Sequence, residues 1–103
     1  GTRERSTVAP QALAMLNSPF IRELSGNFAK RVRPDAKTTI EQAVTSAYRL
    51  ALARTPNSNE KESMVAFIKS QAVSRKGQAN AEELAIRDFC QLLFCSNEFV
   101  YVD

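Results

Sequence analysis

Residues 88–102 read DFCQLLFCSNEFVYV, and this stretch decides how the rest of the chain folds. From Phe89 to Cys95 every position except Gln91 is apolar. A surface helix carries an apolar stripe about 100° wide, whereas a helix that is apolar on nearly all sides is buried on most of them. The helical segments predicted before this stretch each have one apolar face. We therefore expect amphipathic helices packed around a buried C-terminal helix.

The length of the chain, 103 residues, is enough for one hydrophobic core and too short for two. We predict that residues 1–103 form a single all-α domain, a bundle of about five helices. No apolar run approaches the ~18 residues that a transmembrane helix needs, and the N-terminus lacks the apolar segment of a signal peptide. The first residue is not Met, so we expect an excised fragment of a larger protein.

Helix-starting residues and apolar spacing divide the chain into segments. Pro10 and Pro19 each suit the first position of a helix, and Ser18 is a good N-cap for the second of these helices. Residues 1–9 are polar and unpatterned, which predicts an extended arm. The predicted helices cover residues 10–17, 19–32, 39–54, 58–76 and 81–97.

Capping boxes precede the later helices. In such a box the N-cap residue and a Glu or Gln three positions later satisfy each other's backbone amides. The candidate pairs are Thr38 and Glu41 or Thr39 and Gln42, then Asn57 and Glu60, then Asn80 and Glu83.

Two glycines lie within or after predicted helices. Gly77 is the best candidate for ending the fourth helix, because glycine readily adopts the left-handed conformation found there. Gly26 weakens the second helix by roughly 1 kcal/mol relative to alanine, which indicates a close contact with another helix.

The C-terminal helix should bury its apolar side chains against the earlier helices. Cys90 and Cys95 lie five positions apart, so they diverge by about 140° on one helix and cannot form a disulfide within it. The simplest interpretation is that both cysteines are small hydrophobic residues of the core. We expect Phe89, Leu92, Leu93 and either Cys90 or Cys95 to be nearly fully buried, in contact with Leu24, Phe28, Val44 and Phe67.

The net charge of +3 includes a weak basic cluster, Lys30, Arg31, Arg33 and Lys37. One interpretation is a phosphate-binding face. The favoured interpretation is a helix C-terminus whose dipole attracts cations, followed by a solvated turn. No aromatic residues interleave with these cations, so nucleic-acid binding is disfavoured.

The chemical inventory for catalysis is poor. The chain has no histidine, the commonest general base and metal ligand. A nucleophilic cysteine needs an electropositive, partly exposed site and usually a base, whereas Cys90 and Cys95 lie in the most apolar stretch. We therefore predict no catalytic residue, cofactor or metal in this fragment, and no enzymatic activity of its own.

Four polar residues remain as candidate interaction or structural positions: Arg54, Glu60, Asn97 and Glu98. The favoured role for Arg54 is to neutralise the C-terminus of one helix and to reach Glu60 at the start of the next. Asn97 and Glu98 could contact a ligand. Their commoner role is to satisfy terminal backbone groups of the last helix or to tie down the N-terminal arm.

Four motifs in order resemble a known family: RSTVAPQAL at 5–13, LNSPF at 16–20, YRLALARTP at 48–56 and NEFVYVD at 97–103. The chain resembles the C-terminal end of a planctomycete-specific domain of unknown function, which lies downstream of planctomycete cytochrome-c-like domains. One departure is Ala53, where the family pattern has glycine; it affects only the local helix ending.

The resemblance implies a planctomycete source, an extracytoplasmic parent protein, periplasmic or secreted, and a haem domain elsewhere in that parent. The first function class is then a structural or interaction module whose partner is the rest of the parent chain or another protein. The second is a non-catalytic part of a redox or polymer-degrading enzyme with its active site upstream. An upstream C-x-x-C-H motif would separate these classes in part.

Overall fold

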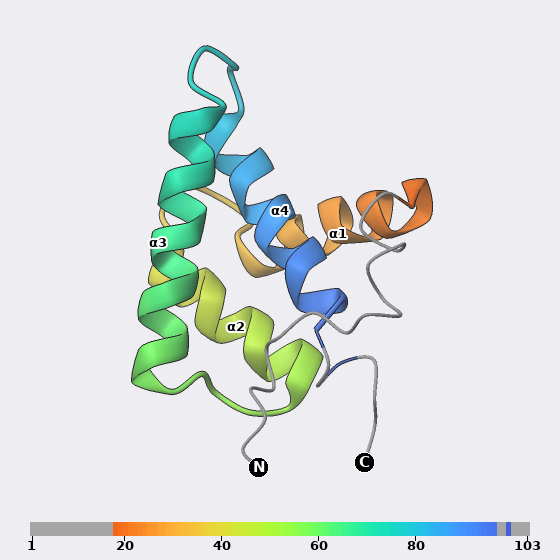
Figure 1. Ribbon diagram of the computed structural model, residues 1–103, viewed down its shortest axis with the longest axis vertical. Coiled ribbons are helices and arrows are strands. Elements are labelled where there is room, and N and C mark those ends of the chain that lie inside the picture. The colour runs from red at the N-terminus through yellow and green to blue at the C-terminus, as the bar shows by residue number, and fades with distance from the viewer. Residues whose placement is uncertain (1–17, 97–98, 100–103) are drawn as a thin grey trace.

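A computed structural model of the chain describes residues 18–96 and Phe99. This part of the chain contains four helices and no strand, so the fold is all-α. The predicted helix 10–17, the predicted arm 1–9 and the end of the last predicted helix at 97 lie outside the described residues. The helices are α1 at Pro19–Val32, α2 at Ile40–Leu52, α3 at Ser58–Ser74 and α4 at Ala81–Phe94 (Figure 1).

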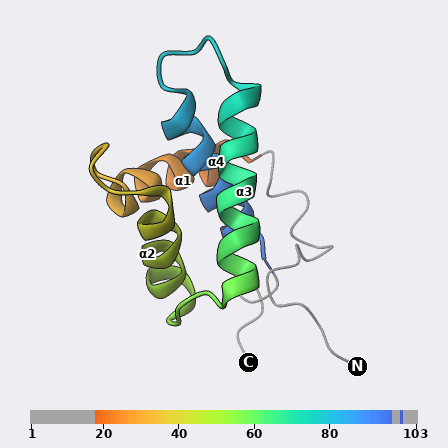
Figure 2. The ribbon, with the colours of Figure 1, turned by 90° about the vertical axis from the view of Figure 1, so that its left-hand side faces the viewer.

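The other three helices each pack against α4. It packs chiefly against α1 and α3. Figures 1 and 2 together place α4 between α3 on one side and α1 on the other, with α2 below them. α3 and α4 run antiparallel and are joined by a turn at one end of the molecule.

Three of the predicted caps are present. The Thr39 hydroxyl accepts a hydrogen bond from the Gln42 N–H at 3.1 Å, and the Thr39 N–H donates to the Gln42 side-chain oxygen at 2.9 Å. The box before α2 therefore begins at Thr39 and not at Thr38. Ser18 caps α1, and Asn57 opens a second complete box before α3.

The fourth predicted cap, Asn80, is wrong. Its side chain makes no capping hydrogen bond, and its backbone has φ −116° and ψ 36°. An N-cap side chain reaches the first-turn amides from an extended backbone, which Asn80 does not have. Glu82 and Glu83 in the first turn of α4 instead complement the positive end of the helix dipole.

α2 ends at Leu52, two residues before the predicted boundary, because Ala53 adopts the left-handed conformation. Its φ is 58° and its ψ is 31°, and its N–H donates to the Arg49 carbonyl at 3.1 Å. Within the described residues it is the only residue other than glycine with positive φ. A Cβ atom is strained in this left-handed conformation.

Helices α3 and α4 also end earlier than predicted. α3 stops at Ser74 and not at 76, and Gly77, with φ 101°, lies in the turn beyond rather than directly after the helix. α4 stops at Phe94, where the chain tightens and the Ser96 N–H donates to the Leu93 carbonyl at 3.1 Å. A hydrogen bond from an N–H to the carbonyl three residues earlier is common where a helix ends.

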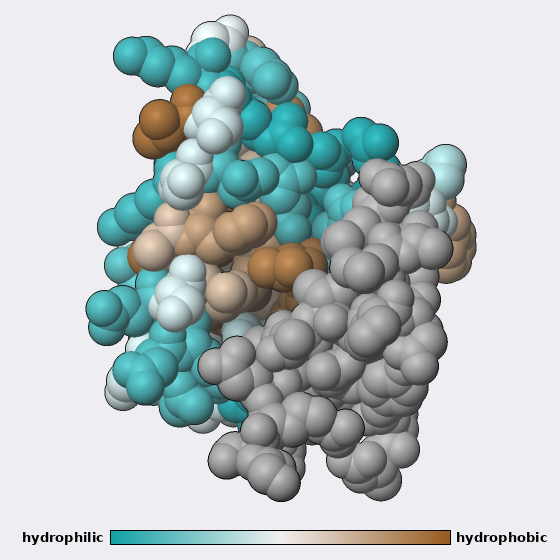
Figure 3. Space-filling view, viewed as in Figure 1, coloured by the Kyte–Doolittle hydropathy of each residue, from teal (hydrophilic) through white to brown (hydrophobic). Residues whose placement is uncertain are grey.

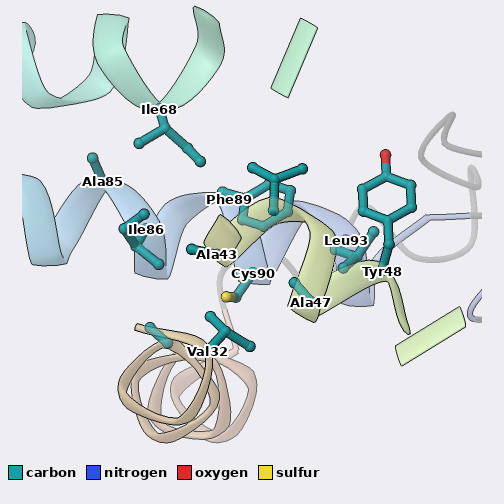
Figure 4. Packing of buried hydrophobic residues seen from close by; sticks show 12 residues of the cluster. Val32, Ala43, Ala47, Tyr48, Ile68, Ala85, Ile86, Phe89, Cys90 and Leu93 are labelled. Carbon is teal, nitrogen blue, oxygen red and sulfur yellow. The ribbon is translucent and has the colours of Figure 1, made fainter. Parts of the chain in front are cut away.

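One hydrophobic core receives residues from all four helices. Figure 4 shows Cys90 of α4 between Val32 of α1 and Ala47 of α2. Tyr48 of α2 stacks on Phe89 of α4, with ring centroids 6.4 Å apart and an interplanar angle of 17°. The buried cluster consists of Ala29, Val32, Ala43, Val44, Ala47, Tyr48, Ile68, Ala85, Ile86, Phe89, Cys90 and Leu93.

Part of the predicted core is wrong. Leu92 is only half-buried, because the buried residues of α4 lie on one face and Leu92 falls beside that face. Of the four expected contact residues, Val44 is buried in the core, and Phe28 and Phe67 pack against it, as predicted. Leu24 is 40% exposed and is not among the residues of this cluster or packed against it. Cys90 and Cys95 are both buried, whereas only one of them was required by the prediction.

Gly26 faces α4, as its place in α1 predicted, but the contact does not require glycine. A Cβ atom at this position would lie 3.8 Å from Cδ of Arg87, an ordinary van der Waals distance. The interface between α1 and α4 has room for alanine at Gly26.

Replacing Leu93 by alanine tests the core. Leu93 is 3% exposed, so Leu93→Ala should lower the free energy of unfolding by ~2–5 kcal/mol, the range for buried leucine. Leu92→Ala is the matched control on the same helix and should cost clearly less. Chemical denaturation measures both; equal losses would mean that the buried face of α4 is assigned wrongly.

Replacing Ala53 by glycine should stabilise the protein. Relief of the left-handed strain outweighs the greater chain entropy of glycine, for a net gain of about 0.5–1 kcal/mol in the free energy of unfolding. Ala51→Gly, inside α2, should destabilise it by a similar amount. Thermal or chemical denaturation measures both changes, and a destabilised Ala53→Gly variant would contradict the assigned conformation.

Candidate functional site

The corner between α2 and α3 brings together two of the predicted polar residues. Arg54 and Glu60 form a two-pronged ion pair, with Nη1 to Oε1 at 2.8 Å and Nη2 to Oε2 at 2.7 Å. Glu60 Oε1 also accepts the Asn57 N–H at 2.9 Å. The Arg54 guanidinium carbon lies 5.4 Å from the centre of the Tyr48 ring. The expected contact between Arg54 and Glu60 is therefore present.

This arrangement joins two helices more readily than it supports a reaction. Both carboxylate oxygens of Glu60 accept hydrogen bonds, and its side chain is 17% exposed. Paired donors of this geometry fix the orientation of a carboxylate. Arg54 is in turn held over an aromatic face. The corner fixes the angle between α2 and α3.

A second polar cluster, between α3 and α4, was not predicted. Asp88 Oδ2 accepts from Gln71 Nε2 at 3.1 Å and from Arg75 Nε at 2.9 Å, and Oδ1 accepts from Arg75 Nη2 at 3.1 Å. Arg87 Nη2 lies at 3.5 Å from Oδ1. The Asp88 side chain is 12% exposed. The sequence signal was a carboxylate at the edge of an apolar stretch, with Gln71 and Arg75 one turn apart on a neighbouring helix.

Arg33 forms the third polar tie, at the C-terminus of α1. Its Nε donates to the Thr38 carbonyl at 2.9 Å, and its guanidinium forms an ion pair with Glu82 of α4. Arg33 therefore turns away from the predicted basic cluster. Lys30, Arg31 and Lys37 remain exposed.

The two thiols are enclosed in the protein. Both cysteines are free and buried. Burial raises the pKa of the Cys90 thiol to about 12 and raises the pKa of Cys95 as well. Both thiols are therefore protonated near pH 7, and a protonated thiol is a weak nucleophile and metal ligand. Among residues 18–96 and 99, no cluster of three or more Cys, Asp or Glu could hold a metal ion.

A groove in the described part of the chain lies beside α3 and opens widely to solvent. It has a volume of ≈ 460 Å³. Its charges alternate in sign and its apolar residues are small, which is typical of a solvated helix surface more than of an enclosed ligand site. The lining residues are Glu41, Ser58, Lys61, Glu62, Val65, Ala66 and Lys69.

Large apolar side chains are exposed on α1. Phe20 is 70% exposed and Leu24 40% exposed, although Ile21 and Val32, about 60–120° round the helix from them, are buried. Of these residues, only Leu24 was expected to contact the C-terminal helix. Elsewhere, Figure 3 shows apolar residues in the middle of the face where α3 and α4 lie side by side, with hydrophilic residues along the outer edge of α3.

The remaining predicted positions, Asn97 and Glu98, lie outside the described residues. None of the helices in the described part is long and apolar enough to cross a membrane. The polar residues that the structure brings together are therefore Arg54 with Glu60, and, unpredicted, Asp88 with Gln71, Arg75 and Arg87.

Comparison with known proteins identifies the family. The model of PSD1, a protein family of unknown function (DUF1553), matches residues 1–68. The chain belongs to this family. The match includes three of the four motifs that carry the resemblance, and the fourth, at 97–103, lies beyond it. No curated protein and no solved structure matches the PSD1 chain significantly.

Removing the charge of Asp88 tests whether the unpredicted cluster stabilises the fold. Asp88→Asn leaves Arg75 without its carboxylate and should cost ~2–3 kcal/mol in the free energy of unfolding. Glu82→Gln is the matched control, because the Glu82 side chain is 49% exposed and its pair should be worth below ~1 kcal/mol. Urea denaturation measures the free energy of unfolding of both variants. Equally small losses of this free energy would mean that the Asp88 cluster stabilises the fold no more than an exposed ion pair does.

Proposed function

We propose that this chain is a structural and interaction module of a larger protein, with α1 supplying the docking surface. The observation that carries the proposal is the exposure of Phe20 and Leu24, one turn apart on α1. Fully burying such a side chain is worth roughly 1.5–3 kcal/mol. Adjacent exposed apolar residues that the protein's own core does not use are typical of binding surfaces.

The polar chemistry of the described residues supports the same role. Glu60, Asp88 and Arg33 are each engaged between helices or helix ends, so they stiffen the bundle. A rigid support with one apolar helix face suits recognition, because little order must be gained on binding. The interaction class is therefore better supported than an active site within residues 18–96.

The wider setting is also a proposal and rests on the sequence resemblance. The larger protein is extracytoplasmic, of planctomycete source, and this chain forms its C-terminal part beside a haem domain. The 103 residues include no histidine, and Met64 is half-buried against the core. Met15, the other methionine, lies outside the described residues. We expect residues outside this chain to hold the haem, because the chain has no histidine. The partner of α1 is the rest of the parent chain or another protein.

Cysteine labelling in the isolated chain and in the full-length protein tests the docking role. Leu24→Cys introduces a thiol on α1, whereas the native thiols are buried and should label slowly. We expect fast maleimide labelling in the isolated chain and about tenfold slower labelling in the full-length protein. Mass spectrometry measures both rates.

Val73→Cys is the control, because Val73 is 72% exposed and lies on α3. It should label equally fast in both forms. Equal labelling of Leu24→Cys in both forms, with the folded state retained, would show that α1 is not a docking surface.

A further inference from the structure

Four exposed residues form a continuous seam along α1: Phe20, Leu24, Asn27 and Arg31. Their spacing of four, three and four positions keeps them in line on one side of the helix. At 1.5 Å per residue the seam is about 17 Å long. This spacing is the one through which helices pack side by side.

Another side of α1, about 125° round the helix from the seam, is already occupied by the core. Ile21, Ser25, Ala29 and Val32 are buried there, and the Ser25 hydroxyl donates to the Ile21 carbonyl at 2.7 Å. The orientation of α1 is therefore fixed by its packing. The seam faces away from that core and changes chemistry along its length, from apolar at Phe20 and Leu24 to cationic at Arg31.

The cationic end of the seam has an excess of positive charge. Lys30 and Arg31 occupy the last turn of α1, and Lys37 follows in the connecting turn; all three are exposed. The helix dipole offsets only about half a charge at this end. Glu23 is the one exposed acid of α1 and lies near its other end. A partner complementary to this surface carries carboxylates near Arg31.

A second copy of the chain fits the seam less well. An antiparallel pair of α1 helices would place Arg31 on the other copy's Phe20, and a parallel pair would bring two Arg31 side chains together. The antiparallel pair would bring only Glu23 of the other copy toward Lys30, one carboxylate against the three exposed cations Lys30, Arg31 and Lys37. Like charges facing each other in an interface disfavour that pairing.

We propose that the seam binds an acidic amphipathic helix of another polypeptide. The apolar residues of that helix lie on Phe20 and Leu24, and its carboxylates lie beside Arg31 and Lys30. Helix-in-groove recognition of this type reads apolar anchors at three- and four-residue spacing. The proposal rests on the proposed function and adds the chemistry of the partner.

Synthetic helical peptides provide the probe. Three peptides share one leucine seam and carry glutamate, glutamine or lysine at the flanking positions near one end. Titration into the isotope-labelled 103-residue chain, followed by NMR, gives the affinity and the residues contacted. We expect the glutamate peptide to bind about tenfold more tightly than the lysine peptide at low salt, with shifts along α1, and the difference to shrink as salt is added.

Variants separate the two parts of the seam. Arg31→Glu should reverse the preference between the glutamate and lysine peptides. Lys69→Glu, an exposed charge on α3, is the matched control and should leave the preference unchanged. Phe20→Ser with Leu24→Ser should abolish binding of all three peptides, while circular dichroism shows the helices retained.

Each contrary result has a distinct meaning. Equal binding of the three peptides, lost in the Phe20→Ser and Leu24→Ser variant, would overturn the acidic partner and leave docking on α1 intact. Absence of peptide binding, with concentration-dependent dimerisation or binding to phosphatidylglycerol vesicles that requires Phe20, would replace the helix with a second copy or a lipid surface. If Leu24→Cys reacts with maleimide as fast in the full-length protein as in the isolated chain, that result would instead contradict the proposed function itself.

Discussion

The burial of one face of α4 among the other three helices is the interaction on which the rest of the structure depends. Phe89, Cys90 and Leu93 occupy the centre of the core, and each of the other helices contributes residues that contact this cluster. α2 contributes Ala43 and Ala47, small residues that let two helices approach closely. In a single core of this size, little other apolar surface is left to stabilise the fold.

The polar contacts determine angles between helices that apolar packing alone leaves loose. Asp88 ties α4 to α3, Arg33 ties α1 to α4, and Arg54 with Glu60 closes the corner between α2 and α3. A core of apolar side chains tolerates several arrangements, whereas directional hydrogen bonds favour one of them. The rigid bundle that results holds Phe20 and Leu24 of α1 outside the core.

Local features were predictable from the sequence, and features that depend on tertiary contact were not. Thr39 and Asn57 act within one helical turn, and Arg54 reaches Glu60 across a short loop, so spacing alone was sufficient. The cap at Asn80 failed because the preceding turn sets its backbone angles. Asp88 binds residues 13 and 17 positions away, a pairing that requires the antiparallel placement of α3 and α4.

The apolar face of α1 shows the same limit of periodicity. Helical spacing predicts that one broad side is apolar, but the width covered by neighbours depends on how the helix is rotated against them. Ile21 lies inside the contact between α1 and the rest of the bundle, and Leu24 lies at the edge of this contact. The buried face of α4 likewise includes Leu93 and excludes Leu92.

Native-state hydrogen exchange measured by NMR tests the central role of α4 most directly. Amides from Phe89 to Leu93 should exchange only through global unfolding, with opening free energies equal to the unfolding free energy from denaturation. Amides in the first turns of α1, around Leu24, should open at lower free energy, because one side of that helix is uncovered. Slowest exchange in α2 or α3, with α4 opening locally, would contradict the account.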